Sequence, residues 1–289
     1  MEDRIIRKIK RDEYELVNHE YVYELKRSAG DLDSDIYAYD LCLRGHIKDF
    51  EKNVQEIWSY AFSEMINNVM DHSMAENVRV IVNQNYMMTS AMILDDGVGI
   101  FRKIQDFFHL DSIDDAICEL FKGKLTTDAE NHSGEGIFFS SKLMDEFFIL
   151  SSGKVFASNK YDDSRIIDMK SSGQEGTCVF MGLSNDSHKT AKEIFDEYAD
   201  VDGGFVKTRI PLKNVFDSSP VSRSQAKRIC NRLDKFDEVI VDFAEISWMG
   251  QGFAHQLFVV FAGSHPEIII TPINMNEDVT KMYNHVRTA

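Results

Sequence analysis

The sequence contains little cysteine, little proline and no long apolar run. Its 4 cysteines lie far apart, at 42, 118, 178 and 230, without the Cys-x-x-Cys spacing of a zinc ribbon or a redox motif. We therefore predict free thiols and a reducing compartment. Apolar runs such as residues 257–262 are far shorter than the roughly 18 residues that a membrane span requires, and the first residues lack the apolar core of a signal peptide. These absences predict a cytoplasmic protein with no membrane partner.

Positive charge is also scarce. Lysine and arginine total 32 against 48 acidic residues, which leaves a formal charge of −16. This charge repels phosphate backbones and argues against bulk nucleic-acid binding. The local exception is a basic cluster in the first twelve residues, which comprises Arg4, Arg7, Lys8, Lys10 and Arg11. A solvated terminus is the simpler interpretation of this cluster. The length of 289 residues predicts two domains at about 150 residues each.

Hydrophobic periodicity predicts the elements of the first domain. Alternation of large residues predicts two strands, around 21–25 and 37–43, and from Phe50 to Val69 the apolar stripe has helical spacing. The polar stretch 109–135 is predicted to be a partly helical, mobile excursion. Further strands are predicted at 78–83, 90–94, 147–151, 165–169 and 177–183, and a helix at 137–144.

After residue 184 the pattern changes to alternating strands and helices. A polar helix at about 188–198 leads into this second unit. Strands are predicted at 205–210, 239–243 and 268–273, and helices at 223–235, 253–262 and 279–286. This alternation is typical of a small α/β layer.

The predicted helix at 50–69 carries a polar triplet. Glu64, Asn68 and Asp71 are spaced by four and three residues, so they share one arc beside the apolar stripe. A carboxylate and an amide one turn apart suit a hydrated magnesium ion, because the amide oxygen is a hard ligand and the carboxylate can hold or deprotonate water. Taken alone, the triplet is better explained as a solvated flank of the helix.

An acidic and glycine-rich box follows the strand predicted at 90–94. It reads Asp95-Asp96-Gly97-Val98-Gly99. The glycines allow a ligand to approach the backbone, and the Asp95 carboxylate is an acceptor that suits an exocyclic amine such as that of adenine. A structural turn explains the same box equally well.

Two further boxes contain glycine. Ser133-Gly134-Glu135-Gly136-Ile137 opens the helix predicted at 137–144, and a glycine-rich entry to a helix can bind phosphate. Gly176-Thr177 begins a strand, where a small residue and a hydroxyl can face a base or its bound water. Taken singly, the second of these is a negligible signal.

Together, the order Glu-x-x-x-Asn, Asp-x-Gly-x-Gly, Gly-x-Gly, Gly-Thr resembles the GHKL ATP-binding superfamily. This superfamily includes gyrase, the heat-shock chaperone ATPases, sensor histidine kinases and mismatch-repair ATPases, and the resemblance covers about residues 50–184. It implies an α/β fold of the GHKL type, an α+β two-layer sandwich with a mixed sheet and helices on one face, and the ligands ATP and Mg²⁺. A Walker A motif is absent, since residues 122–125 lack the earlier glycine and the following Ser or Thr.

The resemblance also implies a role for each box. Asn68 would hold magnesium, Glu64 would be the catalytic residue that orients or activates the nucleophile, and Asp95 would accept the adenine amine. Residues 105–133 would form the ATP lid, with Lys124 among its cations. The other candidates for contact with the nucleotide are Asp71, His72, Gly97, Gly99, Gly134, Glu135, Gly136, Ile137 and Thr177. Asp71-His72-Ser73 is not a hydrolase triad, because adjacent helical side chains point about 100° apart.

The segment 239–261 resembles the STAS-type domain of anti-sigma-factor antagonists, in particular the STAS-like domains fused behind GHKL domains. It begins Val-Ile-Val-Asp-Phe-Ala-Glu-Ile-Ser-Trp-Met-Gly-Gln-Gly-Phe-Ala. In phosphorylated antagonists a serine follows the strand at a helix start, whereas the matching turn here is Gly250-Gln251-Gly252. Ser247 comes earlier, where packing or a turn is its expected role, so the usual phosphoserine switch is not predicted.

A basic helix precedes this segment. Ser222 and Gln225 have the spacing of a capping box, and the helix that follows carries Arg223, Lys227 and Arg228. Exposed partners for an acidic protein are the default interpretation of these cations. The alternative hypothesis is contact with the nucleotide or the lid, because GHKL ATPases commonly receive a cation from the following domain.

These resemblances predict a division into an N-terminal arm with wing-like strands (1–49), a GHKL domain (50–184), a linker helix (185–204) and a STAS-like domain (205–289). We expect a slow Mg-ATP-dependent ATPase that acts as a regulatory switch through its STAS-like domain. A protein serine/threonine kinase of the anti-sigma-factor type and a non-catalytic ATP-binding module remain open alternatives. A protein partner and self-association into a homodimer are expected, and DNA binding through the arm is the minority interpretation.

Overall fold

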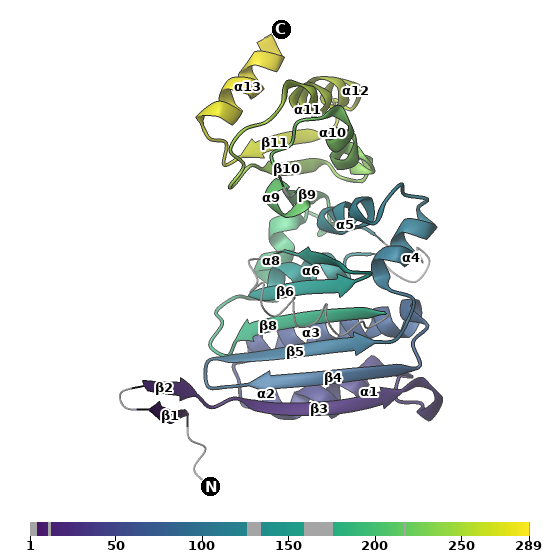
Figure 1. The fold of residues 1–289 in the computed structure, drawn as a ribbon, viewed down its shortest axis with the longest axis vertical. Coiled ribbons are helices and arrows are strands. Elements are labelled where there is room, and N and C mark those ends of the chain that lie inside the picture. The colour runs from purple at the N-terminus through teal and green to yellow at the C-terminus, as the bar shows by residue number, and fades with distance from the viewer. Residues whose placement is uncertain (1–4, 11–12, 126–133, 159–175, 217, 289) are drawn as a thin grey trace. The chain divides into compact units, whose positions relative to one another are not determined.

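The computed structural model describes residues 5–10, 13–125, 134–158, 176–216 and 218–288. The chain forms two compact units (Figure 1): the first comprises residues 1–106 and 139–194, and the second comprises residues 107–138 and 195–289. All four cysteines are free, as predicted. Within the described ranges, no helix combines the length and the apolar character needed to cross a membrane.

The first unit is built on a six-stranded sheet in the order β3-β4-β5-β8-β6-β7. Every pairing between these strands is antiparallel, so the expectation of a mixed sheet is wrong for the described strands. The strands are β3 (His19–Lys26), β4 (Asn77–Gln84), β5 (Met88–Asp95), β6 (Glu146–Ser151), β7 (Lys154–Ala157) and β8 (Thr177–Ser184). The strand predicted at 165–169 lies outside the described residues, and β7 was not predicted.

Helices cover one face of this sheet, where Figure 1 shows α1, α2 and α3 behind the strands. The residues of β5 alternate in burial, and the buried ones, including Ala91, Ile93 and Asp95, share one face. The predicted long helix is confirmed as α3 (Lys52–Asn68), continued by the π-helical turn η3 (Val69–Ser73). Its predicted apolar stripe is buried from Val54 to Val69, while Phe50, before the helix, is half-buried. The other helices are α1 (Asp35–Tyr39), η2 (Asp40–Arg44) and α2 (Gly45–Ile47), and the short turn η1 (Arg27–Ala29) precedes them.

The strand predicted at 37–43 is wrong, because this segment is helical. Ser34 caps α1 by accepting a hydrogen bond from the Tyr37 N–H at 3.3 Å. Ala38 and Cys42, one helical turn apart, are buried, whereas Tyr37 and Leu41 are exposed. Burial therefore follows a helical period, which overrides the alternation of large residues seen in the sequence.

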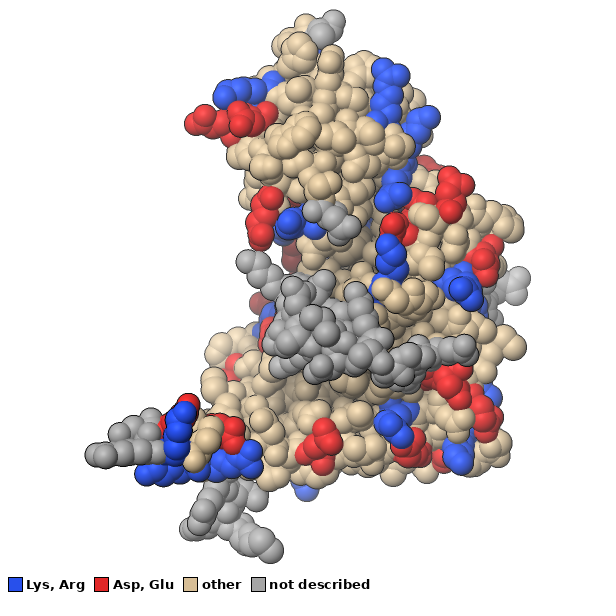
Figure 2. Space-filling model, viewed as in Figure 1, with Lys and Arg blue, Asp and Glu red and all other residues tan. Residues whose placement is uncertain are grey.

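An isolated hairpin precedes the sheet. Its strands are β1 (Ile6–Lys10) and β2 (Glu13–Leu16). Arg7 pairs with Glu15, and Lys10 pairs with Glu13, so Figure 2 shows both signs of charge on the hairpin. The predicted basic cluster is thus partly neutralised in its described part, while Arg4 and Arg11 lie outside the described residues.

The second unit contains a parallel three-stranded sheet in the order β11-β10-β9, which confirms the predicted α/β alternation. Its strands are β9 (Lys207–Pro211), β10 (Glu238–Asp242) and β11 (Ile269–Ile273). Its helices are α9 (Leu212–Val215), α10 (Arg223–Cys230), η4 (Leu233–Lys235), α11 (Gln251–His255), η5 (Gln256–Phe261), α12 (Ala262–Ser264) and α13 (Glu277–Thr288). The boundary between the units at 194/195 falls within α8 (Ala191–Tyr198).

The predicted excursion at 109–135 contains a helix of the second unit. Helix α5 (Ile113–Lys122) begins at the N-cap Ser112, and all its residues from 116 to 122 are buried. It is flanked in the sequence by α4 (Ile100–Phe107) and α6 (Gly136–Leu143). The described part of the excursion is therefore mostly folded, with α5 packed into a core.

Candidate functional site

Among the described carboxylates of the first unit, Asp95, the last residue of β5, is buried. It is 3 % exposed, and it accepts a hydrogen bond from the Gly97 N–H at 2.8 Å. Burial raises its pKa to about 6, although the N–H groups of Gly97 and Thr177 act in the opposite direction. No lysine or arginine of the described residues pairs with it. Asp95 is therefore a buried acceptor whose charge has only backbone partners.

The neighbouring Asp96 has a structural role. Its carboxylate accepts hydrogen bonds from the N–H groups of Glu76 and Asn77, at 2.9 and 3.0 Å, and from the Asn77 side chain at 2.7 Å. The hydrogen bonds from Asn77 lower its pKa. Asp96 thus ties the loop after β5 to the start of β4.

Close backbone packing explains the glycines of this loop. A Cβ on Gly97 would lie 2.2 Å from the Ser73 carbonyl oxygen, and one on Gly176 would lie 2.1 Å from the Asp95 carbonyl oxygen. Gly99 has φ +80°, and its Cβ would meet the Ser151 hydroxyl at 2.8 Å. The turn interpretation therefore accounts for these glycines, which are not by themselves evidence of a ligand.

Thr177, the first residue of β8, contacts the residue that follows this loop. Its buried hydroxyl accepts a hydrogen bond from the N–H of Ile100, the first residue of α4, at 3.0 Å. Ser151, at the end of β6, donates to the Gly176 carbonyl at 2.9 Å. The structure thus brings Asp95, Gly97, Gly99 and Thr177 together where the neighbouring strands β5 and β8 end and begin. Ser151 is a neighbour that the sequence did not reveal.

The C-terminal end of α3 contacts the same loop, because the Val98 N–H donates to the Ser73 carbonyl at 2.9 Å. Glu64 and Asn68 are both half-buried, one turn apart on α3, as the spacing predicted. Within the described part of the chain, the Asn68 amide makes no hydrogen bond. Such an amide oxygen remains available to a ligand.

Lys103 is a cation of this region that the sequence did not single out. Its ammonium donates to the His72 carbonyl at 2.8 Å, from helix α4 to η3. Burial lowers the pKa of Lys103, although Asp71 nearby acts in the opposite direction. Nothing in the sequence pointed to this residue, because Lys103 belongs to no motif. Its contact with η3 forms only when α4 folds against that turn.

The described residues contain no cluster of three or more His, Cys, Asp or Glu side chains that could hold a metal ion by themselves. A magnesium ion bound with a nucleotide needs fewer protein ligands, because phosphate oxygens and waters complete its octahedral shell. The amide of Asn68 and the carboxylate of Glu64 fit this second kind of site.

The other predicted nucleotide ligands, Lys124 and residues 134–137, belong to the second unit. The Leu125 N–H donates to the Gly134 carbonyl at 2.9 Å, and Gly134 has φ +73°. The Lys124 ammonium donates to the Lys235 carbonyl at 2.8 Å and lies 4.9 Å from the centre of the Phe236 ring. Lys124 is therefore engaged within its own unit.

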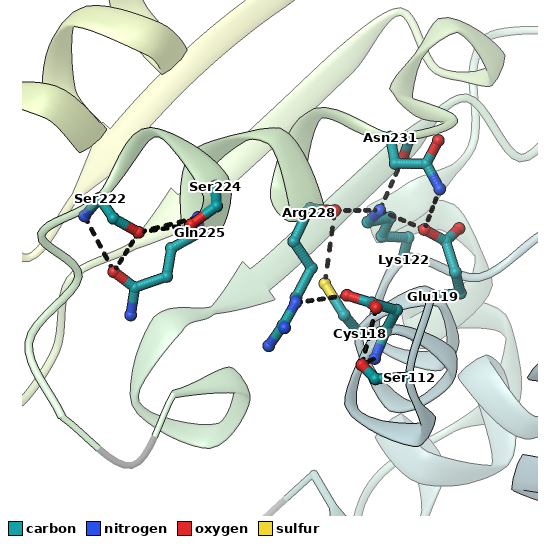
Figure 3. A network of polar contacts seen from close by, with 10 residues as sticks. Ser112, Cys118, Glu119, Lys122, Ser222, Ser224, Gln225, Arg228 and Asn231 are labelled. Carbon is teal, nitrogen blue, oxygen red and sulfur yellow. Dashed lines mark hydrogen bonds and ion pairs between the residues drawn. The ribbon is translucent and has the colours of Figure 1, made fainter. Parts of the chain in front are cut away.

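The basic helix α10 begins with the predicted capping box, in which Ser222 and Gln225 exchange hydrogen bonds (Figure 3). Arg228 pairs with Asp115 of α5 at 2.5 Å, so one of its cations contacts a helix of the predicted lid. Arg223 and Lys227 are exposed and have no acidic partner among the described residues.

The strand-to-helix turn of the second unit places Gly250 at the N-cap of α11. Ser247 lies before this turn, and its hydroxyl is 3.1 Å from that of Ser219. The parallel sheet and this turn are consistent with the predicted STAS-like architecture.

Comparison with known proteins identifies part of this unit. Residues 225–280 match the STAS-like domain of unknown function (DUF4325). A search of curated proteins gave no match. The matched range includes β10, α11 and β11, while β9 and α5 lie outside it. The C-terminal part of the chain therefore contains a STAS-like domain.

Proposed function

We propose that this protein is a GHKL-type ATPase that binds Mg-ATP and acts as a nucleotide-operated switch through its STAS-like domain. The observation that carries the proposal is the buried carboxylate of Asp95, at the end of a strand, with no cation beside it. Burying such a charge is costly, and a structural ion pair does not account for it here. Recognition of an amine-bearing ligand such as adenine gives the carboxylate a function.

The arrangement of α3 supports the metal and catalytic roles. The half-buried Asn68 can supply an oxygen ligand to magnesium, which neutralises phosphate charge. Glu64, one turn earlier, can take the proton of an attacking water as the bond to the ADP oxygen breaks. We expect slow turnover, because a switch must remain in its ATP-bound state long enough to signal.

The first test is titration of the full chain with ATP by calorimetry, with magnesium and then with a chelator. We expect binding that depends on magnesium. Asp95→Asn should weaken ATP binding by about 10- to 100-fold, because an amide group places a donor where the adenine amine needs an acceptor. The control is Asp96→Asn, the same substitution one residue later, which should leave affinity within about threefold. Absence of ATP binding to the wild type, or equal losses in both variants, would contradict the proposal.

The hydrolytic role of Glu64 has a separate test. Glu64→Gln should lower phosphate release by about 100-fold or more while ATP still binds. The control is Glu56→Gln, on the same helix, where Glu56 is exposed and pairs with Lys52. Equal phosphate release by the wild type and Glu64→Gln would remove the catalytic role of Glu64. Transfer of the labelled γ-phosphate to another protein would instead favour the kinase alternative.

A further inference from the structure

Strand β3 forms an open edge of the six-stranded sheet. It is the first strand in the order β3-β4-β5-β8-β6-β7, and no described strand pairs with its other side. At the end of β3, the Lys26 N–H donates to the Asp31 carboxylate at 2.9 Å, and the Asp31 N–H donates to the Lys26 carbonyl at 3.1 Å. Backbone groups alternate between the two sides of a strand, so those of Glu20, Val22 and Glu24 point the same way as those of Lys26. Among the described residues these three positions have no backbone partner on that side.

The side chains of these three positions combine one apolar residue with two carboxylates. Val22 is 52 % exposed, and Glu20 and Glu24, two residues to either side, are also exposed. Alternation places all three on one face of β3. Two copies of β3 that paired through all three positions would place Glu20 opposite Glu24 twice, and like charges directly opposite are destabilising. The edge therefore suits a strand that carries a cation beside an apolar residue.

The N-terminal hairpin contains such a strand. Every residue of β1 is exposed, and its sequence Ile-Arg-Lys-Ile-Lys places Arg7 and Ile9 on one face. With Ile9 beside Val22, Arg7 lies beside Glu20 if the two strands are parallel and beside Glu24 if they are antiparallel. The charges of β1 and β3 are thus complementary in both directions.

The hairpin also lacks a third strand. Among the described strands β1 pairs only with β2, and an isolated two-stranded hairpin is marginally stable at best in water. The pair of Arg7 with Glu15 within the hairpin is exposed, so it contributes little. Both β1 and β3 therefore have an open edge that a further strand would stabilise.

The hairpin is poorly placed to cover the β3 edge of its own chain. Strand β2 ends at Leu16 and β3 begins at His19, so folding back would make Val17-Asn18 a two-residue hairpin loop. The favoured loops of this length need a positive φ at their first residue, which a β-branched valine disfavours. Folding back would also bring the acidic strand β2, Glu-Tyr-Glu-Leu, against the carboxylates of β3. A second copy of the chain meets neither obstacle.

We propose that the β3 edge binds strand β1 of a second copy of this chain, so that two chains exchange their N-terminal hairpins. Backbone hydrogen bonds between the strands give the affinity, and the cation of β1 beside the carboxylates of β3 selects the pairing. A twofold axis makes the exchange reciprocal, because each copy supplies one hairpin and one edge. The interface does not involve Asp95 or Asn68, so it is independent of the proposed function.

The first test measures dimerisation of the full chain without nucleotide, by analytical ultracentrifugation over a range of concentrations. We expect the wild type to dimerise. Val22→Pro removes an N–H that β4 does not use, so the sheet should remain folded while the dimer weakens by about 100-fold or more. The control is Val22→Thr, which keeps the N–H and a β-branched side chain and should dimerise within about threefold of the wild type. Thermal unfolding checks that both variants are folded.

An exchange of charges gives a second test that needs no proline. Arg7→Glu and, separately, the double variant Glu20→Lys, Glu24→Lys should each weaken the homodimer by about tenfold or more, because like charges then meet at both copies of the interface. An equimolar mixture of the two should dimerise like the wild type. In the mixed dimer the altered hairpin lies beside the altered edge, and the unaltered hairpin lies beside the unaltered edge.

The outcomes decide the proposal without reference to ATP. A wild type that stays monomeric at every concentration overturns it. A dimer that persists in folded Val22→Pro also overturns it, because the chains would then associate through another surface. If Val22→Pro does not fold, the exchange of charges decides alone: a mixture that dimerises no better than the separate variants shows that β1 is not the strand bound at the edge.

Discussion

The two units bury acidic side chains in opposite ways. In the second unit, Glu119 is buried with Lys122, and the carboxylate of Asp242 accepts from Arg209, at 2.6 Å, and from Asn274. In the first unit, Asp95 has only backbone N–H partners. The carboxylates of the second unit are explained by their ion pairs, whereas no ion pair among the described residues explains that of Asp95.

The pKa values of Asp95 and Asp242 shift in opposite directions, in line with their different partners. Burial raises the pKa of both strand-end carboxyls, but the hydrogen bonds from Arg209, Asn274 and the Ala244 N–H bring that of Asp242 below its ordinary value. At Asp95 burial dominates, and the pKa rises to about 6. Two aspartates at the ends of strands thus have opposite effects on stability when they ionise.

The largest effect on stability should come from breaking the buried pair of α5. Lys122→Met leaves Glu119 buried beside fewer donors, and we expect a loss of about 3–5 kcal/mol in the free energy of unfolding. Denaturant titration of the full chain measures it. The control is Lys227→Met, at an exposed lysine of the neighbouring helix α10, which should change stability by less than about 0.5 kcal/mol. Similar losses in both variants would mean that the buried pair does not anchor α5.

A smaller loss is expected at Asp242. Asp242→Asn removes the charged partner of Arg209, whose side chain is 38 % exposed, so part of the pair is screened by solvent. We expect a loss of about 1–2 kcal/mol at neutral pH. Because the folded-state pKa of Asp242 is lowered, the wild type should lose this advantage as the pH falls through that pKa. A loss that does not shrink in acid would show that the charge is not what stabilises the contact.

Much of the fold could be predicted from the sequence, because apolar periodicity and burial agree in most elements. Helix α3 and strands β4, β5, β6 and β8 follow their patterns. The segment 35–47 could not be predicted, since Tyr37 and Leu41 alternate like strand residues but lie on the exposed side of a helix. The place of α5 was also hidden, because Glu119, Lys122 and Asn231 meet only through tertiary packing.

The candidate site was predictable only in part. The order of the boxes pointed to Asp95, Asn68 and Thr177, and the Asp-x-Gly-x-Gly spacing selected Asp95 rather than Asp96. The burial of Asp95 and the N–H groups that donate to each carboxylate could not be predicted, because they depend on tertiary packing. Lys103 lies in no box, so its contact with the His72 carbonyl appears only in the folded chain.

Without nucleotide, Asp95 should make the stability of the protein depend on pH. The pKa of Asp95 is raised from the ordinary 3.8 to about 6, so the folded state holds a proton that the unfolded chain has released, and this residue makes stability fall as the pH rises between these values. Asp95→Asn removes that dependence. We expect the variant to be more stable than the wild type above pH 6 by only about 1 kcal/mol, because the buried amide N–H groups also need partners.

Thermal unfolding of Asp95→Asn and the wild type at pH 4, 5, 6 and 8 tests this expectation, with Asp96→Asn as the control. The advantage of Asp95→Asn should grow from pH 4 to pH 6 and then stay constant. Asp96, whose pKa is lowered by Asn77, should show the opposite sign when it is replaced. If Asp95→Asn destabilises the protein at pH 8, the carboxylate is part of the framework, as in the second unit, and the reason for assigning it a ligand disappears.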